Sequence, residues 1–246
     1  MIQLSALPRP AKLTDDLVIK LTKRFRDTGK SVWIQSFIKE YLLKMSHDKC
    51  AFCECNIVEE SKYLEVEHYL PKSIYDGKVV DWANLLPACK RCNGCKSDHN
   101  TAIEPIVHPV NDKPNEHLKW YHYFFKGKTI IGKTTIQVLQ INDIRIRNPR
   151  TKIGAATIEQ LENLRDLIEL YEDKPAVKWR NKIQSWLDKI MKEAQPHSEY
   201  SATVATVIWH CEAYHFVKDF FQKQGWWNNE LQELERVIAL NAFDIN

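Results

Sequence analysis

The chain has 246 residues, of which 44% are apolar and 27% are charged, so a packed core can form and a disordered chain is excluded. Only 7 residues are glycine, a composition that disfavours turn-rich sandwiches, barrels and propellers and favours helices. Residues 159–246 contain 10 basic and 15 acidic side chains, which leaves 25 and 17 for residues 1–158, so only the first part favours a polyanion.

Neither a membrane span nor a secretory leader is expected. No apolar run approaches about 18 residues, and the first residues lack a basic stretch followed by an apolar one. We therefore expect a cytoplasmic protein. Six of the seven cysteines fall between Cys50 and Cys95, and such clustering in a chain of this length favours a metal site over disulfides.

Residues 1–46 predict an N-terminal helical segment with two helices. Thr14 can cap the first helix, and Gly29 interrupts it. Ser31 can cap the second helix. The apolar side of this second helix consists of Ile34, Phe37, Ile38, Tyr41, Leu42 and Met45.

Two CxxC pairs dominate residues 47–108. Cys50 and Cys53 form the first pair, and Cys89 and Cys92 form the second, with 35 residues between the pairs. A CxxC turn brings two thiolates onto one face, and two such turns complete the tetrahedral ligand set of a structural zinc site. The alternative is two unrelated pairs of buried cysteines.

The three other cysteines are weaker ligand candidates. Cys55 follows Cys53 too closely for the usual knuckle, whereas Cys95 forms a third CxxC with Cys92 and leaves a register slip open. Cys211 lies on an apolar helical face and is interpreted as a packing residue.

The segment between the two CxxC pairs contains an acid–histidine pair, Glu67 and His68. Apolar residues alternate with glutamates from Leu64 onward, which predicts a short strand in which Glu67 and His68 point to opposite sides. A single histidine in a strand is usually a packed or exposed side chain. Its position between two zinc knuckles, with Asn84 and Asn93 downstream, favours a catalytic site instead.

Residues 104–118, which contain three prolines, predict a linker. The aromatic and β-branched runs that follow flank Gly127, which allows a hairpin. A helix from Lys133 fits this segment equally well.

The segment 117–158 is strongly basic, with eight lysines and arginines against a single acid. We expect some of these cations, Arg145 and Arg147 among them, to contact nucleic-acid phosphates without reading sequence. Its aromatic residues could stack on unpaired bases, but packing in a core is the simpler interpretation.

Residues 109–246 are assigned as a mostly helical C-terminal region, so the predicted fold class is mainly α. Apolar stripes at helical spacing indicate helices over residues 158–171, 176–194 and 199–222, and a last helix around residues 231–238. The acidic, aromatic end of this region is a reasonable surface for a protein partner.

At its cysteine-rich centre the sequence resembles the HNH nucleases, whose fold is the ββα-metal motif. The family pattern is a CxxC, an acid–His pair followed two residues later by a proline, an Asn-Leu-Leu, and a CxxC-Asn-x-x-Lys. Here the proline, Pro71, lies at the third position after His68. This chain matches it at Cys50, Cys53, Glu67, His68, Pro71, Asn84, Cys89, Cys92, Asn93 and Lys96. The resemblance predicts a zinc-stapled ββα unit in the middle of the chain, and it is specific because several spacings agree at once.

The resemblance also implies a role for each residue of the site. His68 would be the general base that takes a proton from water. Glu67 and Asn93 would hold one catalytic Mg²⁺ or Mn²⁺, with waters and phosphate oxygens completing the shell. Asn84 would hold the ring or the backbone of His68, and Lys96 would bind a phosphate of the substrate.

Two departures from the family pattern bear on these roles. The acid is Glu67, where Asp or His is common, so local geometry must accommodate an extra methylene. The last residue of the motif is Asn93 instead of His, and His99, six residues later, should face another side of the helix. A surface position for Lys96 and an ordinary turn role for Asn84 stay open.

Over more of its length the chain resembles the PtuB-type nucleases of the Septu anti-phage systems, a relative of which accompanies some retrons. This resemblance implies a PtuA-like ATPase partner, a DNA or tRNA target and, where a retron is present, its reverse transcriptase and multicopy DNA. Two other functions stay open: a zinc-stapled nucleic-acid-binding or adaptor module without catalysis, and a stand-alone restriction-type nuclease.

Overall fold

The computed structural model describes residues 1–59 and 63–245. The chain is mainly helical with two small two-stranded sheets, which confirms the predicted fold class. It divides into two compact units. Unit 1 comprises Met1–Leu118 and Lys126–Ile141, and unit 2 comprises Lys119–Phe125 and Asn142–Asn246. Among the helices described, none is both long enough and apolar enough to cross a membrane.

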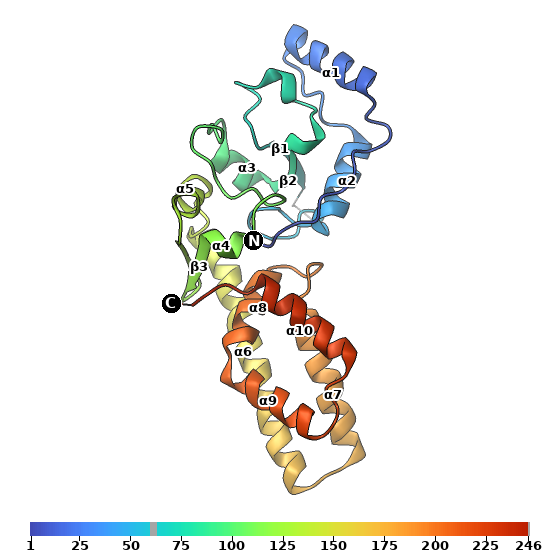
Figure 1. Ribbon diagram of the computed structural model, residues 1–246, viewed down its shortest axis with the longest axis vertical. Helices are drawn as coiled ribbons and strands as arrows, with labels where there is room; N and C mark the ends of the chain where they lie inside the picture. Colours follow the sequence, from blue (N-terminus) through green and yellow to red (C-terminus); the bar gives the residue numbers. More distant parts are fainter. Residues whose placement is uncertain (60–62, 246) are drawn as a thin grey trace. The chain divides into compact units, whose positions relative to one another are not determined.

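Unit 1 is built around a short two-stranded sheet against which helices α2 and α3 pack (Figure 1). The buried core of this unit includes Ile38 and Leu42 of α2 and Leu85 and Leu86 of β2. Its helices and strands are α1 (Asp15–Thr28), α2 (Ser36–Ser46), β1 (Leu64–His68), the 3-10 turns η1 (Asp76–Lys78) and η2 (Trp82–Asn84), β2 (Leu85–Cys89), α3 (Lys90–Lys96), α4 (Pro114–His117) and α5 (Ile130–Leu139).

The predicted strand over residues 64–68 is confirmed as β1. It pairs antiparallel with β2 in a register that sets Leu64 opposite Cys89 and His68 opposite Leu85. Because side chains alternate along a strand, the two glutamates of β1 share one face and His68 lies on the other. The chain leaves β2 directly into α3, so strand, strand and helix form the predicted ββα unit.

The two N-terminal helices are present, but the second begins later than predicted. The Thr14 hydroxyl caps α1 and Gly29 ends it in the left-handed region at φ 65°, as the sequence indicates. The prediction that Ser31 caps the second helix is wrong, because α2 begins at Ser36. The intervening residues form a turn that buries Trp33, so tertiary packing overrides the local capping signal.

The segment predicted as a linker is partly core. Ile106 and Val107 are fully buried in unit 1, and the Val107 N–H donates to the Thr135 hydroxyl at 2.8 Å. A buried, hydrogen-bonded segment is held in one conformation, so this part of residues 104–118 is no linker.

Both alternatives for the aromatic segment occur, one after the other. A hairpin joins β3 (Leu118–Tyr121) to β4 (Phe124–Gly127), and α5 follows it. The turn lies at His122 and Tyr123, whose φ angles of 45° and 67° suit a two-residue hairpin turn, so Gly127 ends a strand instead of forming the turn.

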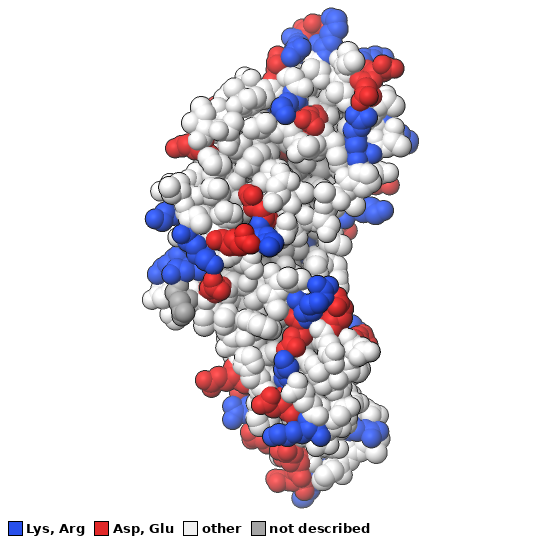
Figure 2. Space-filling model, viewed as in Figure 1, with Lys and Arg blue, Asp and Glu red and all other residues white. Residues whose placement is uncertain are grey.

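Unit 2 is a bundle whose core is formed by apolar residues from all five of its helices. On the face shown in Figure 2, acidic and basic side chains are interspersed over these helices. The predicted single helix over residues 199–222 is wrong, because the backbone at Cys211 is extended, with ψ 124°, and divides it. The helices are α6 (Ile144–Asp173), α7 (Val177–Lys192), α8 (Ser201–His210), α9 (Glu212–Lys223) and α10 (Asn229–Asn241).

Candidate active site

Four thiols come together where the first CxxC turn meets the junction of β2 and α3. The Sγ atoms of Cys50, Cys53, Cys89 and Cys92 all lie within 4.8 Å of one another. Those of Cys53 and Cys89 are 3.8 Å apart, and a tetrahedral zinc site with bonds of ~2.3 Å has edges of ~3.8 Å. The geometry therefore fits one tetrahedral metal ion, as the spacing predicts.

The chemistry of this donor set also fits a cation. Burial raises the pKa of the Cys50 thiol well above its ordinary value, and its thiol neighbours Cys53 and Cys89 raise it further. Such thiols become thiolates only when a bound cation compensates the charge, so metal binding and folding are coupled here. Cys55 lies outside the group of four, although its Sγ is 3.4 Å from that of Cys53.

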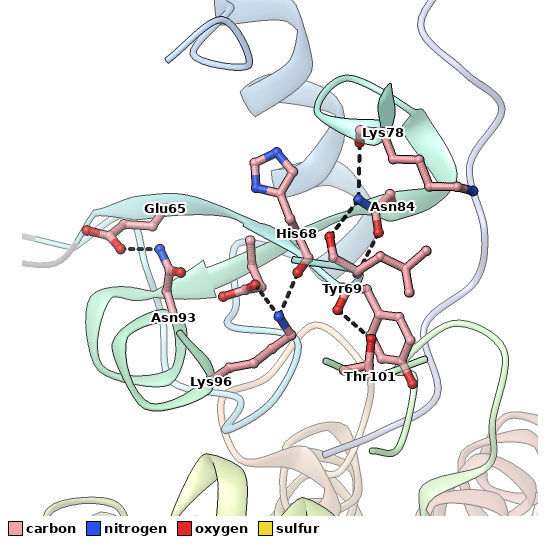
Figure 3. A network of polar contacts seen from close by, with 10 residues as sticks. Glu65, His68, Tyr69, Lys78, Asn84, Asn93, Lys96 and Thr101 are labelled. Carbon is pink, nitrogen blue, oxygen red and sulfur yellow. Dashed lines mark hydrogen bonds and ion pairs between the residues drawn. The ribbon is translucent and has the colours of Figure 1, made fainter. Parts of the chain in front are cut away.

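The face of β1 that carries the two glutamates looks toward α3, which supplies a polar partner for each (Figure 3). The Asn93 amide donates to the Glu65 carboxylate. The Lys96 ammonium donates to Glu67 Oε1 at 2.9 Å and to the His68 carbonyl at 2.7 Å. The predicted pair of Glu67 and Asn93 therefore lies on one face, but each member contacts a different residue.

Glu67 is buried and only half satisfied. Its side chain is 3% exposed, and Oε2 has no hydrogen-bond partner among the described residues. Burial raises the pKa of Glu67, an effect that the Lys96 and Lys72 ammonium groups oppose. A buried carboxylate oxygen without a partner suits a metal ligand, because a bound cation would supply the missing interaction.

His68 lies on the opposite face of β1, as the alternation predicts. Its Nε2 lies 2.9 Å from the Val79 carbonyl, and its ring packs edge-on against Trp33 at a centroid distance of 4.6 Å. Because a carbonyl only accepts, a neutral ring must carry its proton on Nε2, which leaves the lone pair on Nδ1. Burial lowers the pKa of His68 to about 4, so at neutral pH the ring is in the form that can take up a proton.

Asn84 fixes the chain immediately after His68. Its amide accepts from the Leu70 N–H at 2.7 Å and donates to the carbonyls of Leu70 and Lys78, both at 3.1 Å. The Asn84 carbonyl also accepts from the Tyr69 N–H at 2.9 Å. Asn84 thus clamps the backbone beyond the histidine and does not touch the ring.

An open pocket of about 520 Å³ lies beside this face and gives a substrate access to it. Glu65 and Asn93 line the pocket together with Lys72, Lys90 and Asp98. The positive charge of Lys72 also opposes the rise in the pKa of Glu67 and adds to the fall in the pKa of His68. Two cations beside a carboxylate and an amide suit a phosphodiester and a divalent metal.

Glu65, Lys72 and Lys90 are candidate functional residues that the sequence reasoning missed. The signal for Glu65 was present, because it lies two residues before Glu67 and therefore on the same side of a strand. No sequence pattern marks Lys72 and Lys90, since only the fold brings them to one pocket with Asn93.

The remaining predicted residues lie elsewhere. The Lys96 side chain is fully buried against Glu67, and its predicted phosphate contact stays a prediction. His99 turns to Glu104, whose carbonyl is 2.8 Å from its Nε2. Arg145 and Arg147 belong to unit 2, where Arg145 pairs with Asp143.

The comparisons with known proteins agree with this site. Residues 50–99 match the family model described as HNH endonuclease, so the ββα unit with its four cysteines is an HNH endonuclease domain. No solved structure matches the chain.

Two curated relatives extend the similarity beyond this domain. Septu protein PtuB of Bacillus thuringiensis is 45% identical over 95% of this chain and 92% of its own length. Septu protein PtuB of Bacillus mycoides (strain KBAB4) is 26% identical over 69% of this chain and 72% of its own length. The chain belongs to the PtuB family of Septu proteins.

Proposed function

We propose that this chain hydrolyses phosphodiester bonds of a nucleic acid at the pocket beside β1 and α3, as the nuclease component of a bacterial anti-phage complex. The observation that carries the proposal is the meeting of Glu65, Glu67 and Asn93 on one face, with one Glu67 oxygen lacking a partner. These side chains offer the hard oxygen ligands that Mg²⁺ or Mn²⁺ prefers.

The residues of the chain divide the chemistry among them. Glu67 and Asn93, with Glu65 beside them, would hold the divalent ion, which when bound stabilises negative charge on the phosphate and on the leaving oxygen. His68 would take a proton from the attacking water on Nδ1, because the Val79 carbonyl keeps the other proton on Nε2. Lys72 and Lys90 would position the phosphate, and the thiol cluster would bind zinc and fix the fold.

The test is His68→Ala in the full chain, with duplex DNA, single strands and total tRNA as substrates, each with and without Mn²⁺. Cleavage is expected to vanish while zinc content and helix content stay unchanged. His99→Ala is the matched control, because His99 belongs to the same domain but turns to Glu104. Wild-type cleavage by His68→Ala would remove His68 from the proposed chemistry. The absence of cleavage by the wild type and the variant on every substrate would favour the zinc-stapled binding module.

We further propose a PtuA-type ATPase as the partner, on the basis of the PtuB relatives. We place this partner on the acidic, aromatic C-terminal part of unit 2, where Trp209 of α8 is 37% exposed. Removing residues 199–246 would delete α8, α9 and α10 with core residues such as Ile208 and Val217, so surface substitutions are the sharper test.

We expect Trp209→Ala to weaken co-purification with the ATPase. Leu170→Ala, at an exposed position of α6 in the same unit, should leave co-purification unchanged. Equal recovery of the ATPase with both variants would move the partner surface away from α8.

A further inference from the structure

Helix α7 is a basic element in an acidic surrounding. Residues 177–192 carry five lysines and arginines and one acid, whereas the rest of residues 159–246 carries five basic and 14 acidic side chains. This contrast gives residues 159–246, which have five more acidic than basic side chains, one helix to which a polyanion is attracted.

Three of the five basic side chains of α7 share one face with two tryptophans and a serine. Spacings of three, four and seven residues place them along one side of the helix. We call this stripe the Lys–Trp face; it consists of Lys178, Trp179, Lys182, Ser185, Trp186 and Lys189. Its 12 residues, from Lys178 to Lys189, cover about 16 Å, or roughly five stacked nucleotides of one strand.

The lysines of this face have no carboxylate partner in the part of the chain that the structure describes. The Lys182 ammonium instead lies over two rings, 5.5 Å from the centroid of Trp179 and 5.3 Å from that of Trp186. On the same helix Lys192 differs, because it pairs with Asp188 at 2.8 Å and Glu230 at 3.2 Å. The Lys–Trp face therefore keeps its cations available for a ligand.

The face is also hollowed and presents aromatic surface. An open pocket of about 300 Å³ is lined by Lys182, Ser185, Trp186 and Lys189. Trp179 is 37% exposed, and the Trp186 indole N–H donates to Gln160 at 2.8 Å, which fixes the orientation of this ring. A rigid, partly exposed indole between lysines is a stacking platform for an unpaired base.

We infer that the Lys–Trp face binds single-stranded nucleic acid, with the lysines on phosphates and the two indoles against bases. An ammonium held over an exposed ring is weakly bound, so it can move to a phosphate and leave the ring to a base. An acidic protein segment would satisfy the charges but would give the exposed indoles no stacking partner. The inference rests on the proposed function only in taking nucleic acid as the ligand of this chain.

The experiment measures binding of a 5′-fluorescein-labelled 15-nucleotide oligo(dT) by anisotropy, using the full chain without added Mg²⁺ or Mn²⁺. The variant Lys178→Ala/Lys182→Ala/Lys189→Ala should raise Kd at least tenfold. It should also lower the slope of log Kd against log salt by about 2, at ~0.7 for each lost phosphate contact. The control Lys174→Ala/Lys223→Ala/Arg236→Ala removes the same charge from exposed positions of unit 2 outside α7 and should change Kd less than twofold.

Trp179→Ala tests the aromatic part of the inference. It should raise Kd for oligo(dT) about fivefold or more, whereas Trp179→Phe, which keeps a ring, should restore most of the affinity. Circular dichroism of each variant confirms that the helices are intact.

Three outcomes would overturn the inference. They are equal Kd values for the lysine variant and its control, tighter binding of a poly-glutamate peptide than of oligo(dT), and preference for duplex DNA with no effect of Trp179→Ala. Because no cutting is needed, binding at the face with no cleavage of any substrate would reject the proposed catalysis and leave this inference standing.

Discussion

The side-chain amide of Asn93 donates to the carboxylate of Glu65, which lies two residues before Glu67 on the same face of β1. Glu67 itself is held by Lys96 from the next turn of α3. The accessible carboxylate beside the last residue of the HNH motif is therefore Glu65, which also lines the pocket. On the proposed function, this hydrogen bond makes Glu65 a candidate for the metal site, either as a ligand or as the group that orients Asn93.

Glu65→Gln is expected to lower metal-dependent cleavage roughly 10- to 100-fold, because it removes a charge from the metal site but keeps the shape of the side chain. The measurement is the initial rate of cleavage as a function of Mn²⁺ concentration. Glu104→Gln, on the exposed acid that faces His99, should keep the wild-type rate. An unchanged Mn²⁺ dependence in Glu65→Gln would remove Glu65 from the site.

Lys96→Met is expected to destabilise unit 1 by about 3–5 kcal/mol, because it leaves the Glu67 carboxylate buried without its cation. Urea unfolding measures this loss. Glu67→Gln/Lys96→Met should recover part of the stability, since no charge then stays buried alone. If Lys96→Met unfolds like the wild type but binds nucleic acid less tightly, Lys96 is a phosphate ligand instead.

Acid should weaken the fold through His68. Its pKa is lowered to about 4 in the folded protein, below an ordinary value of about 6.5, so the unfolded chain binds the proton first. Stability attributable to the neutral ring is complete above pH 6.5 and falls by about 3 kcal/mol as the pH drops to 4. The measurement compares urea unfolding of the wild type and His68→Gln across this range. Parallel pH profiles for the two proteins would contradict the burial of the ring.

Metal removal is expected to unfold unit 1 and spare unit 2. The four thiols lie in unit 1, and structural zinc supplies folding free energy, whereas the core of unit 2 is apolar. Cys53→Ser should lose the metal, and Cys55→Ser should keep it, as elemental analysis of the purified proteins would report. A metal-free chain with wild-type thermal unfolding would contradict a structural role.

The sequence predicts the parts of this molecule that depend on local spacing. The alternation in residues 64–68 places Glu67 and His68 on opposite faces, and two CxxC pairs bring four thiols together, both as the structure has them. The wrong predictions concern tertiary packing. Ser31 offers a good cap, but burial of Trp33 shifts the helix start, and no local residue marks the break at Cys211.

Side-chain partners were the other limit of sequence reasoning. Spacing could not show that Lys96 turns inward to Glu67, because a lysine at that position suits the surface of a helix equally well. Nor could it show that a backbone carbonyl, that of Val79, selects the tautomer of His68. Both facts depend on which segments lie side by side in the folded chain.

The register of β1 against β2 has a consequence for when the chain gains its activity. Leu64 and Cys89 form the terminal residue pair of the β1–β2 sheet, so an ion bound by Cys89 fixes the register at this end of the sheet. A slip of one residue would turn both glutamates away from α3 and the imidazole toward it. On the proposed function, a newly synthesised chain therefore cannot cleave nucleic acid until its four cysteines have bound zinc, so the zinc supply of the cell limits the amount of active nuclease.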